Sequence, residues 1–164
     1  MIRAATPADA EAVAAIWNPI IRDTAITFWP TERSPSDLAE MIAQRQAQGF
    51  AFLVSTDERG VTGFAATSQF RAGGGYARSL EHTVHVAPGQ RGTGVGRALM
   101  AGVASHAEAA GARLLIGAIT ASNLPSLAFH QRLGFSEWGR IPEAGWKFGR
   151  YHDLVLMGRL LPDG

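Results

Sequence analysis

The sequence predicts a mixed α+β fold in a single domain over residues 1–164. The chain length is close to the roughly 150 residues of one typical domain. Hydrophobic residues make up 46% and charged residues 18%, the balance of a compact globular protein. The predicted elements run strand, two helices, antiparallel meander, strand, helix, strand, helix and two last strands, which places a parallel crossover around residues 84–119.

The first third of the chain predicts one short strand, two helices and a hairpin. Residues 2–4 form the strand, and Thr6-Pro7-Ala8-Asp9 is a helix start, with a hydroxyl cap and an early proline. Apolar residues then recur at helical spacing at Val13, Ile16, Trp17 and Ile20. A second start at 34–37 precedes the stripe Leu38, Met41 and Ile42. The apolar runs 50–55 and 61–70, separated by a turn cluster, predict a β-hairpin.

The rest of the chain alternates strands with helices. The segment 71–76 holds three consecutive glycines and predicts a mobile loop, because such a run cannot form a strand interior. The remaining elements are strands at about 80–86, 113–119, 135–140 and 151–160, and helices at about 95–109 and 124–133.

Charge and cysteine content exclude several classes of function. A net charge of +1 provides no large field for a nucleic-acid backbone or an acidic membrane, so neither is expected as a partner. The chain has no cysteine, which excludes disulfides, thiolate metal sites and thiol catalysis, and no metal is expected. There is no basic-then-apolar leader and no run of about 18 apolar residues, so we expect a cytoplasmic protein.

The sharpest local feature is the turn Arg91-Gly92-Thr93-Gly94-Val95-Gly96-Arg97, which follows a strand and opens a helix. The free amides and dipole of a helix start, entered through glycines, form a cradle for an anion such as a pyrophosphate. The spacing fits neither the dinucleotide fingerprint nor the P-loop. Tight helix packing without a ligand is the alternative explanation for the glycines.

Two motifs in the expected order resemble the Gcn5-related N-acetyltransferase (GNAT) family over nearly the whole chain. The first is Arg91-x-x-Gly94-x-Gly96 after Val84-His85-Val86, and the second is the segment 123–135, which starts with Asn123 and ends Leu-Gly-Phe. The stretches 20–24, 81–84, 128–135 and 147–154 resemble most closely the phosphinothricin and methionine sulfone or sulfoximine acetyltransferases.

The resemblance implies a twisted, mostly antiparallel sheet of about seven strands, with a parallel splayed pair and about four flanking helices. It also implies acetyl-coenzyme A (acetyl-CoA) as co-substrate. The pantetheine arm would pair with the backbone of Val84 and Val86, and the loop amides would hold the pyrophosphate. The expected cofactor-binding residues are Val84, His85, Val86, Arg91, Gly92, Thr93, Gly94, Val95, Gly96, Arg97, Asn123, Ser126 and His130. Arg91 and Arg97 could equally be solvated surface side chains, and Asn123 could equally act only as the N-cap of a helix.

Glu81 is the expected catalytic base. Strand alternation puts Glu81, Thr83 and His85 on one face and His82, Val84 and Val86 on the other. Without the resemblance, Glu81 would be a surface carboxylate. With it, Glu81 deprotonates the acceptor ammonium, and burial would raise its pKa toward the useful range. His130 takes the place of a tyrosine that often serves the family as acid to the thiolate; a hydrogen-bonded helix histidine is the alternative.

Substrate contacts are expected from the segments flanking the glycine loop and from the last hairpin. Arg71 and Arg78 could bind a carboxylate or face solvent, while Phe28, Trp29 and Tyr76 could line an acceptor pocket or belong to the core. Similar enzymes place the segment around Trp146-Lys147-Phe148 over a partner's active site, which implies a homodimer with Lys147 acting across it.

These observations together predict an N-acetyltransferase that acetylates the amine of a small amino acid analogue by direct attack in a ternary complex. Two alternatives are a family member that acetylates a peptide, protein or other small amine, and a module that binds acyl-CoA without turnover.

Overall fold

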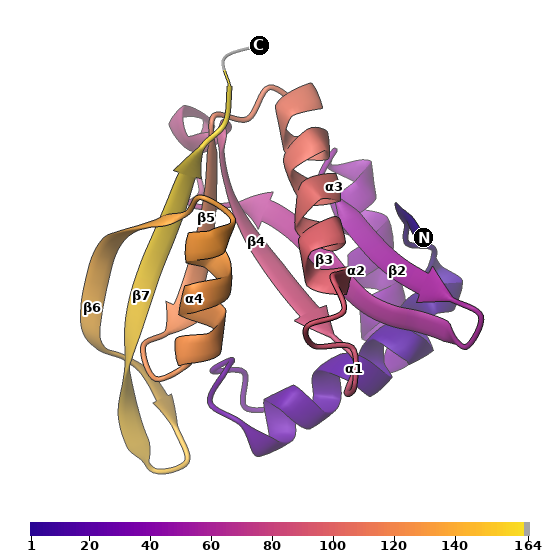
Figure 1. The fold of residues 1–164 in the computed structure, drawn as a ribbon, viewed down its shortest axis with the longest axis horizontal. Helices are drawn as coiled ribbons and strands as arrows, with labels where there is room; N and C mark the ends of the chain where they lie inside the picture. The colour runs from indigo at the N-terminus through magenta and orange to yellow at the C-terminus, as the bar shows by residue number, and fades with distance from the viewer. Residues whose placement is uncertain (163–164) are drawn as a thin grey trace.

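The computed structural model describes residues 1–162, which build one seven-stranded sheet in the order β1-β2-β3-β4-β5-β7-β6 (Figure 1). The strands are β1 Ile2–Ala4, β2 Phe52–Asp57, β3 Gly60–Gln69, β4 Ser79–Val86, β5 Leu114–Thr120, β6 Ser136–Lys147 and β7 Arg150–Leu160. All neighbours are antiparallel except β4 and β5. The predicted mixed α+β architecture, with its parallel crossover, is confirmed.

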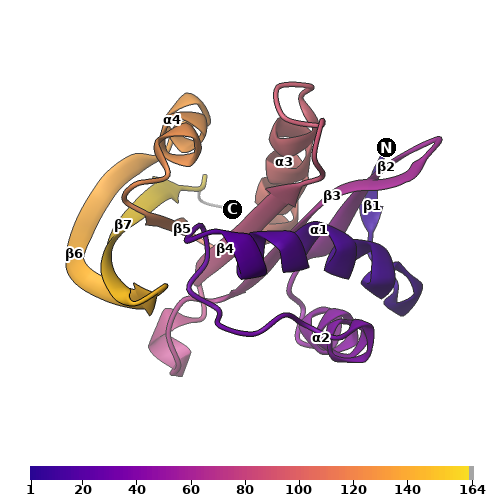
Figure 2. The same cartoon turned by 90° about the horizontal axis from the view of Figure 1, so that it is seen from below.

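Four α-helices cover the two faces of the sheet (Figure 2). They are α1 Ala10–Asp23, α2 Pro35–Ala47, α3 Val95–Ala109 and α4 Leu124–Arg132. Helices α1 and α2 bury one apolar cluster against Phe52, Val54 and Phe64 of the sheet. Helix α3 buries a second cluster on the opposite face with Leu80 and Leu115. No helix within residues 1–162 has the length and apolar character needed to cross a bilayer.

At both helix starts that the sequence predicts, polar side chains cap the backbone. Asp9 closes the short 3₁₀ turn Pro7–Asp9 by accepting the Thr6 amide at 2.8 Å, and it also forms an ion pair with Arg3 at 2.7 Å. The Ser34 hydroxyl accepts the Asp37 amide at 3.1 Å at the start of α2. These bonds satisfy amides that have no partner inside the helices.

Strands β4 and β5 pair only over their first halves and then diverge. Ser79–His82 lie beside Leu114–Gly117, whereas β3 follows β4 up to Val86, and β7 follows β5 up to Thr120. Figure 1 shows the two strands separating toward α1. Within the described residues, the edge of β4 that faces β5 is therefore unpaired beyond His82, and the edge of β5 that faces β4 is unpaired beyond Gly117. We call this divergence the fork.

Two elements differ from the sequence prediction. Strand β6 extends to Lys147 instead of ending near residue 140, because it bends through register shifts at Glu137/Gly139 and Ile141/Gly145. Such irregularities break the alternation from which strands are predicted. The glycine segment is not a strand, as predicted, but it contains an ordered 3₁₀ turn, Gly74–Tyr76.

Candidate active site

The fork exposes backbone groups of β4 that have no strand partner. The Ser79 carbonyl accepts the Phe70 amide at 2.9 Å, and the Ala87 amide donates to Thr62 at 2.9 Å, so odd-numbered residues of β4 bond toward β3. Even-numbered residues consequently face β5. Because pairing with β5 ends at His82, the amide and carbonyl groups of Val84 and Val86 face the open fork, ready for an extended ligand with amide groups.

The glycine turn at the start of α3 lies next to the open end of β4. Gly92 and Gly94 have φ angles of 79° and 92°, and a Cβ on either would meet no atom within 4 Å. Gly94 is the N-cap, and the first helical bond runs from the Ala98 amide to its carbonyl at 3.0 Å. The preceding amides of the first turn thus have no acceptor inside the helix, and the surrounding space is open to an anion.

Gly96 has a different structural role from Gly92 and Gly94. A Cβ there would lie 3.3 Å from the ring of Phe129 on α4, so Gly96 lets the two helices approach closely across the fork. The packing explanation therefore holds for Gly96. The Thr93 hydroxyl bonds to the Gln90 carbonyl at 2.7 Å inside the turn, while Arg91 and Arg97 are exposed.

Glu81 lies in β4 just before the fork opens. Its odd-numbered neighbour His85 contacts the rings of Trp17 and Phe64, so Glu81 faces the side of the sheet covered by α1 and α2. Burial raises the pKa of Glu81, while the Arg45 cation opposes this shift. No hydrogen bond reaches its carboxylate from the described residues 1–162. A half-buried, unpaired carboxylate with a raised pKa is suited to proton transfer.

Two buried histidines meet on the opposite face at the closed end of the fork. His82 Nε2 lies 2.9 Å from His130 Nε2, and His130 Nδ1 lies 2.8 Å from the Ser126 carbonyl oxygen. The rings lie over Gly117, where a Cβ would approach His82 Cε1 to 3.0 Å and His130 Nε2 to 3.4 Å. Gly117 thus allows the β4 and α4 histidines to meet.

The hydrogen bonds of this pair fix its tautomers. A carbonyl oxygen only accepts, so the proton of neutral His130 is on Nδ1. His130 Nε2 then accepts from His82 Nε2–H, which leaves His82 Nδ1 unprotonated and without a hydrogen-bond partner within residues 1–162. His130 has no free N–H in this state. Its predicted role as proton donor therefore requires the pair to take up one more proton, which burial opposes.

We expect this pair to make the fold sensitive to acid. Burial, reinforced by His130 and Arg159 and opposed only by the Ile116 backbone, lowers the pKa of His82 to about 3. The unfolded side chain titrates near 6.5. The stability that neutral His82 provides is therefore complete above pH 6.5 and lost as the pH falls toward 3. Between pH 7.5 and 5 the loss is about 2 kcal/mol.

Urea unfolding at both pH values measures this loss. His82→Gln keeps a donor for His130 but does not titrate, so the acid-induced loss should shrink. The matched control is His106→Gln, because His106 is an exposed histidine of α3 bonded to the Gly49 carbonyl. An unchanged loss in His82→Gln would contradict the assignment.

Asn123 is the N-cap of α4, which is the alternative role that the sequence indicates for it. Its side-chain oxygen accepts the Ser126 amide at 3.3 Å, and the Ser126 hydroxyl lies 3.4 Å from His130 Nδ1. Asn123, Ser126 and His130 thus form one hydrogen-bonded group along α4 at the edge of the fork.

The sequence matches a known protein family over the segment that builds the fork. The model of the acetyltransferase (GNAT) family matches residues 16–135, which include β4, the glycine turn, β5 and α4. The chain belongs to the GNAT acetyltransferase family.

Relatives of this GNAT chain share nearly its whole length. An L-methionine sulfoximine/L-methionine sulfone acetyltransferase of Pseudomonas aeruginosa is 37% identical, covering 95% of this chain and 91% of its own. A phosphinothricin acetyltransferase from Sinorhizobium meliloti, solved in complex with acetyl-CoA, has a TM-score of 0.94 at 31% identity, covering 100% of this chain and 89% of its own. A ribosomal-protein-alanine N-acetyltransferase from Brucella melitensis has a TM-score of 0.94 at 36% identity, with 98% and 99% covered.

The predicted substrate residues of this GNAT chain do not form one cluster. Arg71 and Arg78 are exposed on the β3–β4 connection, and the Arg71 guanidinium lies 5.7 Å from the Tyr76 ring centre. Phe28 packs against Gly145 and lies 5.7 Å from the His152 ring.

Lys147 differs most from its predicted placement. It is 7% exposed, and its ammonium donates to the carbonyls of Ile21, Thr24 and Thr27 of its own chain at 2.5–2.8 Å. All three donors are thereby used at the C-terminal end of α1. In this structure Lys147 anchors the α1–α2 connection instead of reaching for a substrate.

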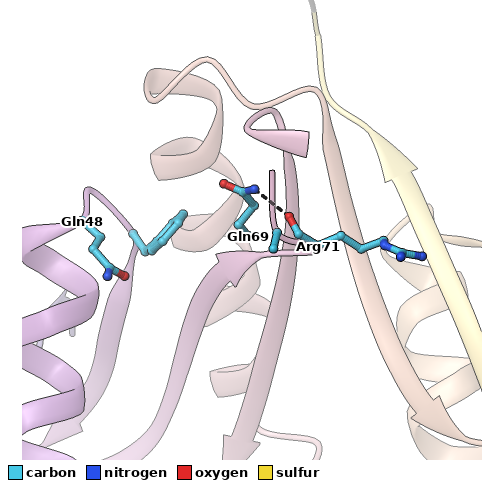
Figure 3. Close-up of a pocket in the computed structure, with 5 residues that line it drawn as sticks. Gln48, Gln69 and Arg71 are labelled. Atoms are coloured by element: carbon cyan, nitrogen blue, oxygen red, sulfur yellow. Dashed lines mark hydrogen bonds between the residues drawn. The ribbon is translucent and has the colours of Figure 1, made fainter. Parts of the chain in front are cut away.

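A surface hollow of about 530 Å³ lies beside the start of β4 (Figure 3). It is lined by Gln48, Phe50, Gln69, Arg71 and Ala72. Neither Glu81 nor the glycine turn borders it, so we place the reaction at the fork.

Sequence reasoning missed residues that share the Glu81 face. Arg45 on α2 donates to the Thr67 carbonyl at 2.7 Å, and burial and the Arg33 cation lower its pKa while the charge of Glu81 opposes this shift. In the sequence, Arg45 is recognisable only as a charged residue near the end of an amphipathic helix, and such residues usually face solvent.

His82, on the opposite face of β4, was also missed, because the sequence marks it only by its position next to Glu81.

Proposed function

We propose that this chain transfers the acetyl group of acetyl-CoA to the amine of a small amino acid analogue of the methionine sulfone, methionine sulfoximine or phosphinothricin type. The observation that carries the proposal is the fork, which has an open glycine turn at one end and the half-buried carboxylate of Glu81 at the other. The names of the relatives over nearly the full chain support this choice of acceptor.

The donor would be held mainly by backbone groups. Val84 and Val86 offer amides and carbonyls to the pantetheine arm as a neighbouring strand would. The amides of residues 92–97, except that of Thr93, which donates to the Gln90 carbonyl at 3.4 Å, would face the pyrophosphate, with the positive end of the α3 dipole behind them. Acetyl-CoA supplies a thioester that is already activated, so positioning and proton transfer are the main contributions of the protein.

Glu81 would take the proton from the acceptor ammonium, directly or through water. The free amine then forms a C–N bond to the acetyl carbon, its nitrogen releases one further proton to solvent to give the neutral amide, and the C–S bond breaks. The sulfur leaves as a thiolate and takes up a proton, for which His130 is the proposed donor once the His82–His130 pair is charged. No residue of the chain becomes acetylated in this scheme.

A homodimer and a cytoplasmic location remain predictions. Support for a homodimer comes from the tip of the β6–β7 hairpin, where Trp146, Phe148 and Tyr151 are each about 60% exposed. Exposed aromatic groups of this kind are typical of an interface.

A protein amine is the second candidate acceptor, because the similar Brucella structure is named for ribosomal-protein-alanine acetylation. An amine panel with acetyl-CoA, scored by release of free coenzyme, separates the candidates. It contains methionine sulfone, methionine sulfoximine, phosphinothricin and an alanine-terminated peptide. We expect acetylation of at least one amino acid analogue with kcat/KM at least tenfold above the peptide. A reaction with the peptide alone would reassign the acceptor, and binding of acetyl-CoA without coenzyme release would indicate a non-catalytic module.

A further inference from the structure

Ser126 is the one residue of α4 that carries a hydroxyl, and the proton of this hydroxyl has no acceptor in the described part of the chain. The Ser126 carbonyl accepts His130 Nδ1–H at 2.8 Å, and the Ser126 amide donates to the Asn123 side chain at 3.3 Å. The hydroxyl oxygen lies 3.4 Å from the same His130 Nδ1. It can only accept there, because the proton of that contact is on the imidazole. The O–H group is therefore free to donate elsewhere.

The position of Ser126 in α4 explains why its hydroxyl is free. A serine within a helix often donates to the carbonyl one turn earlier. Ser126 is the third residue of α4, so that carbonyl belongs to Ser122, before the helix begins, and within residues 1–162 no hydrogen bond joins the two. The Ser126 side chain is half-buried. A half-buried donor without an acceptor in the protein is available to a ligand.

Ser126 lies beside the point where the fork opens. His130 follows it one helical turn later, and a Cβ on Gly117 would lie 3.4 Å from His130 Nε2. Gly117 is the last residue of β5 that pairs with β4. Figure 1 shows that α4 begins near the open end of β5 and runs back toward its paired end. Ser126 is therefore on the open side of His130, next to the unpaired part of the fork.

The sulfur of a bound acetyl-CoA belongs at the same place. A diphosphate at the glycine turn directs the arm along the unpaired backbone groups of Val86 and then Val84, which leaves the thioester near His82, where β4 and β5 come together. Glu81 projects to the face covered by α1 and α2, whereas α4 lies on the face of His82. The acceptor amine and α4 would thus lie on opposite sides of the reacting carbon.

The charge on the departing sulfur needs a donor that the neutral histidine pair does not provide. Breaking the C–S bond leaves a thiolate. His82 Nε2–H is bonded to His130, and His130 Nδ1–H is bonded to the Ser126 carbonyl, so neither proton is free. The Ser126 hydroxyl is free. Its place in the first turn of α4 adds the positive end of the helix dipole, which favours a negative sulfur.

We propose that the Ser126 hydroxyl donates a hydrogen bond to the sulfur of coenzyme A as the C–S bond breaks, which makes Ser126 a catalytic residue. This inference rests on the proposed function and deepens it. The bond strengthens during the reaction, because a thioether-like sulfur is a weak acceptor and a thiolate is a charged one. The hydroxyl keeps its own proton, and the thiolate is protonated afterwards, in the step already assigned to the charged histidine pair.

The pKa of the thiol in bound coenzyme A tests this bond without any acceptor amine. The ultraviolet absorbance of the thiolate is followed from pH 7 upward in wild type and in Ser126→Ala, with desulfo-coenzyme A as the blank. We expect Ser126→Ala to raise the pKa of the bound thiol by about 1 to 2 pH units, the effect of one lost hydrogen bond to a charged group. Ser126→Thr keeps a hydroxyl and should restore the wild-type value. Ser122→Ala is the matched control, since Ser122 is exposed in the β5–α4 connection.

The groups around the fork do not interfere with this titration. Burial lowers the pKa of both His82 and His130, so they stay neutral above pH 7. Glu81 on β4 and Arg159 on β7 are present in every variant, so the difference between variants reports residue 126 alone. Ser126→Ala should fold like the wild type, because the carbonyl and the amide of this residue make the bonds to His130 and to the helix cap.

Single-turnover kinetics add a second readout. We expect Ser126→Ala to slow acetyl transfer by about 10- to 100-fold and to change the dissociation constant of acetyl-CoA by less than about threefold. An interaction that is made only in the transition state lowers the rate and leaves the affinity unchanged.

The outcomes separate this inference from the proposed function. If an amine is acetylated while Ser126→Ala leaves the thiol pKa unchanged, the hydrogen bond to sulfur is refuted and the proposed function stands. A raised thiol pKa with no acetylation of any amine in the panel would support the bond and refute the proposed function. If Ser126→Ala weakens coenzyme A and pantetheine equally without moving the thiol pKa, the hydroxyl binds an amide of the arm, and the inference is overturned.

Discussion

Glu81→Gln is expected to lower kcat/KM for the amino acid acceptor by roughly 100- to 1000-fold at pH 7, the range of a lost general base. Glutamine preserves size and polarity but cannot take a proton. The variant can therefore acetylate only acceptor molecules whose amine is already deprotonated in solution. Its rate should therefore rise about tenfold per pH unit from pH 6 to 9. The wild-type rate should level off above the pKa of Glu81, so the defect is largest at low pH.

The stability of this variant serves as an internal check. Burial raises the pKa of Glu81, so the ionised form costs more in the folded than in the unfolded chain. Above the unfolded pKa near 4.3 this charge destabilises the fold, and its removal should not lower the free energy of unfolding. Lost turnover can then be attributed to chemistry.

Two further variants sharpen the assignment. Arg45→Met removes the cation that lowers the pKa of Glu81, so the acid limb of the pH–rate profile should move to higher pH. Glu137→Gln changes an exposed carboxylate on β6 and should leave the profile unaltered. A Glu81→Gln profile parallel to that of the wild type would remove Glu81 from the role of base.

The backbone part of the site was predictable from the sequence because it depends on local rules. Glycines at the entry to α3 indicated exposed amides, and the alternation of β4 correctly separated Glu81 from His82. The crossover from β4 through α3 to β5 followed from the order of the elements. The glycine turn and the strand alternation each depend on residues within a few positions of one another.

The side-chain partners were not predictable because they join distant segments. Lys147 bonds to carbonyls more than 120 positions away, and His82 meets His130 across 48 positions. The substrate roles predicted for Arg71 and Arg78, the arginines nearest to Glu81 along the chain, stay predictions.

Gly94→Val is expected to weaken coenzyme A binding by at least about 100-fold while leaving the overall fold intact. Gly94 has a φ of 92°, a conformation that β-branched residues avoid at a cost of about 1–2 kcal/mol. Because no atom lies within 4 Å of a Cβ there, the substitution acts through the backbone and not through a clash. We expect the turn to adopt another path and to lose at least two amide–phosphate hydrogen bonds, each worth about 1.5–3 kcal/mol.

Calorimetric titration with two ligands distinguishes this mechanism from general damage. Pantetheine keeps the arm that pairs with Val84 and Val86 but lacks the pyrophosphate, so its affinity should be nearly the same for Gly94→Val and wild type. Gly60→Val introduces the same side chain at another left-handed glycine, with φ 117°, in the distant β2–β3 turn, and should bind coenzyme A normally. An equal loss of affinity for both ligands, or an unchanged affinity for coenzyme A, would mean that the amides at the start of α3 do not hold the diphosphate. The reason is that pantetheine lacks the diphosphate, so the substitution should affect coenzyme A alone.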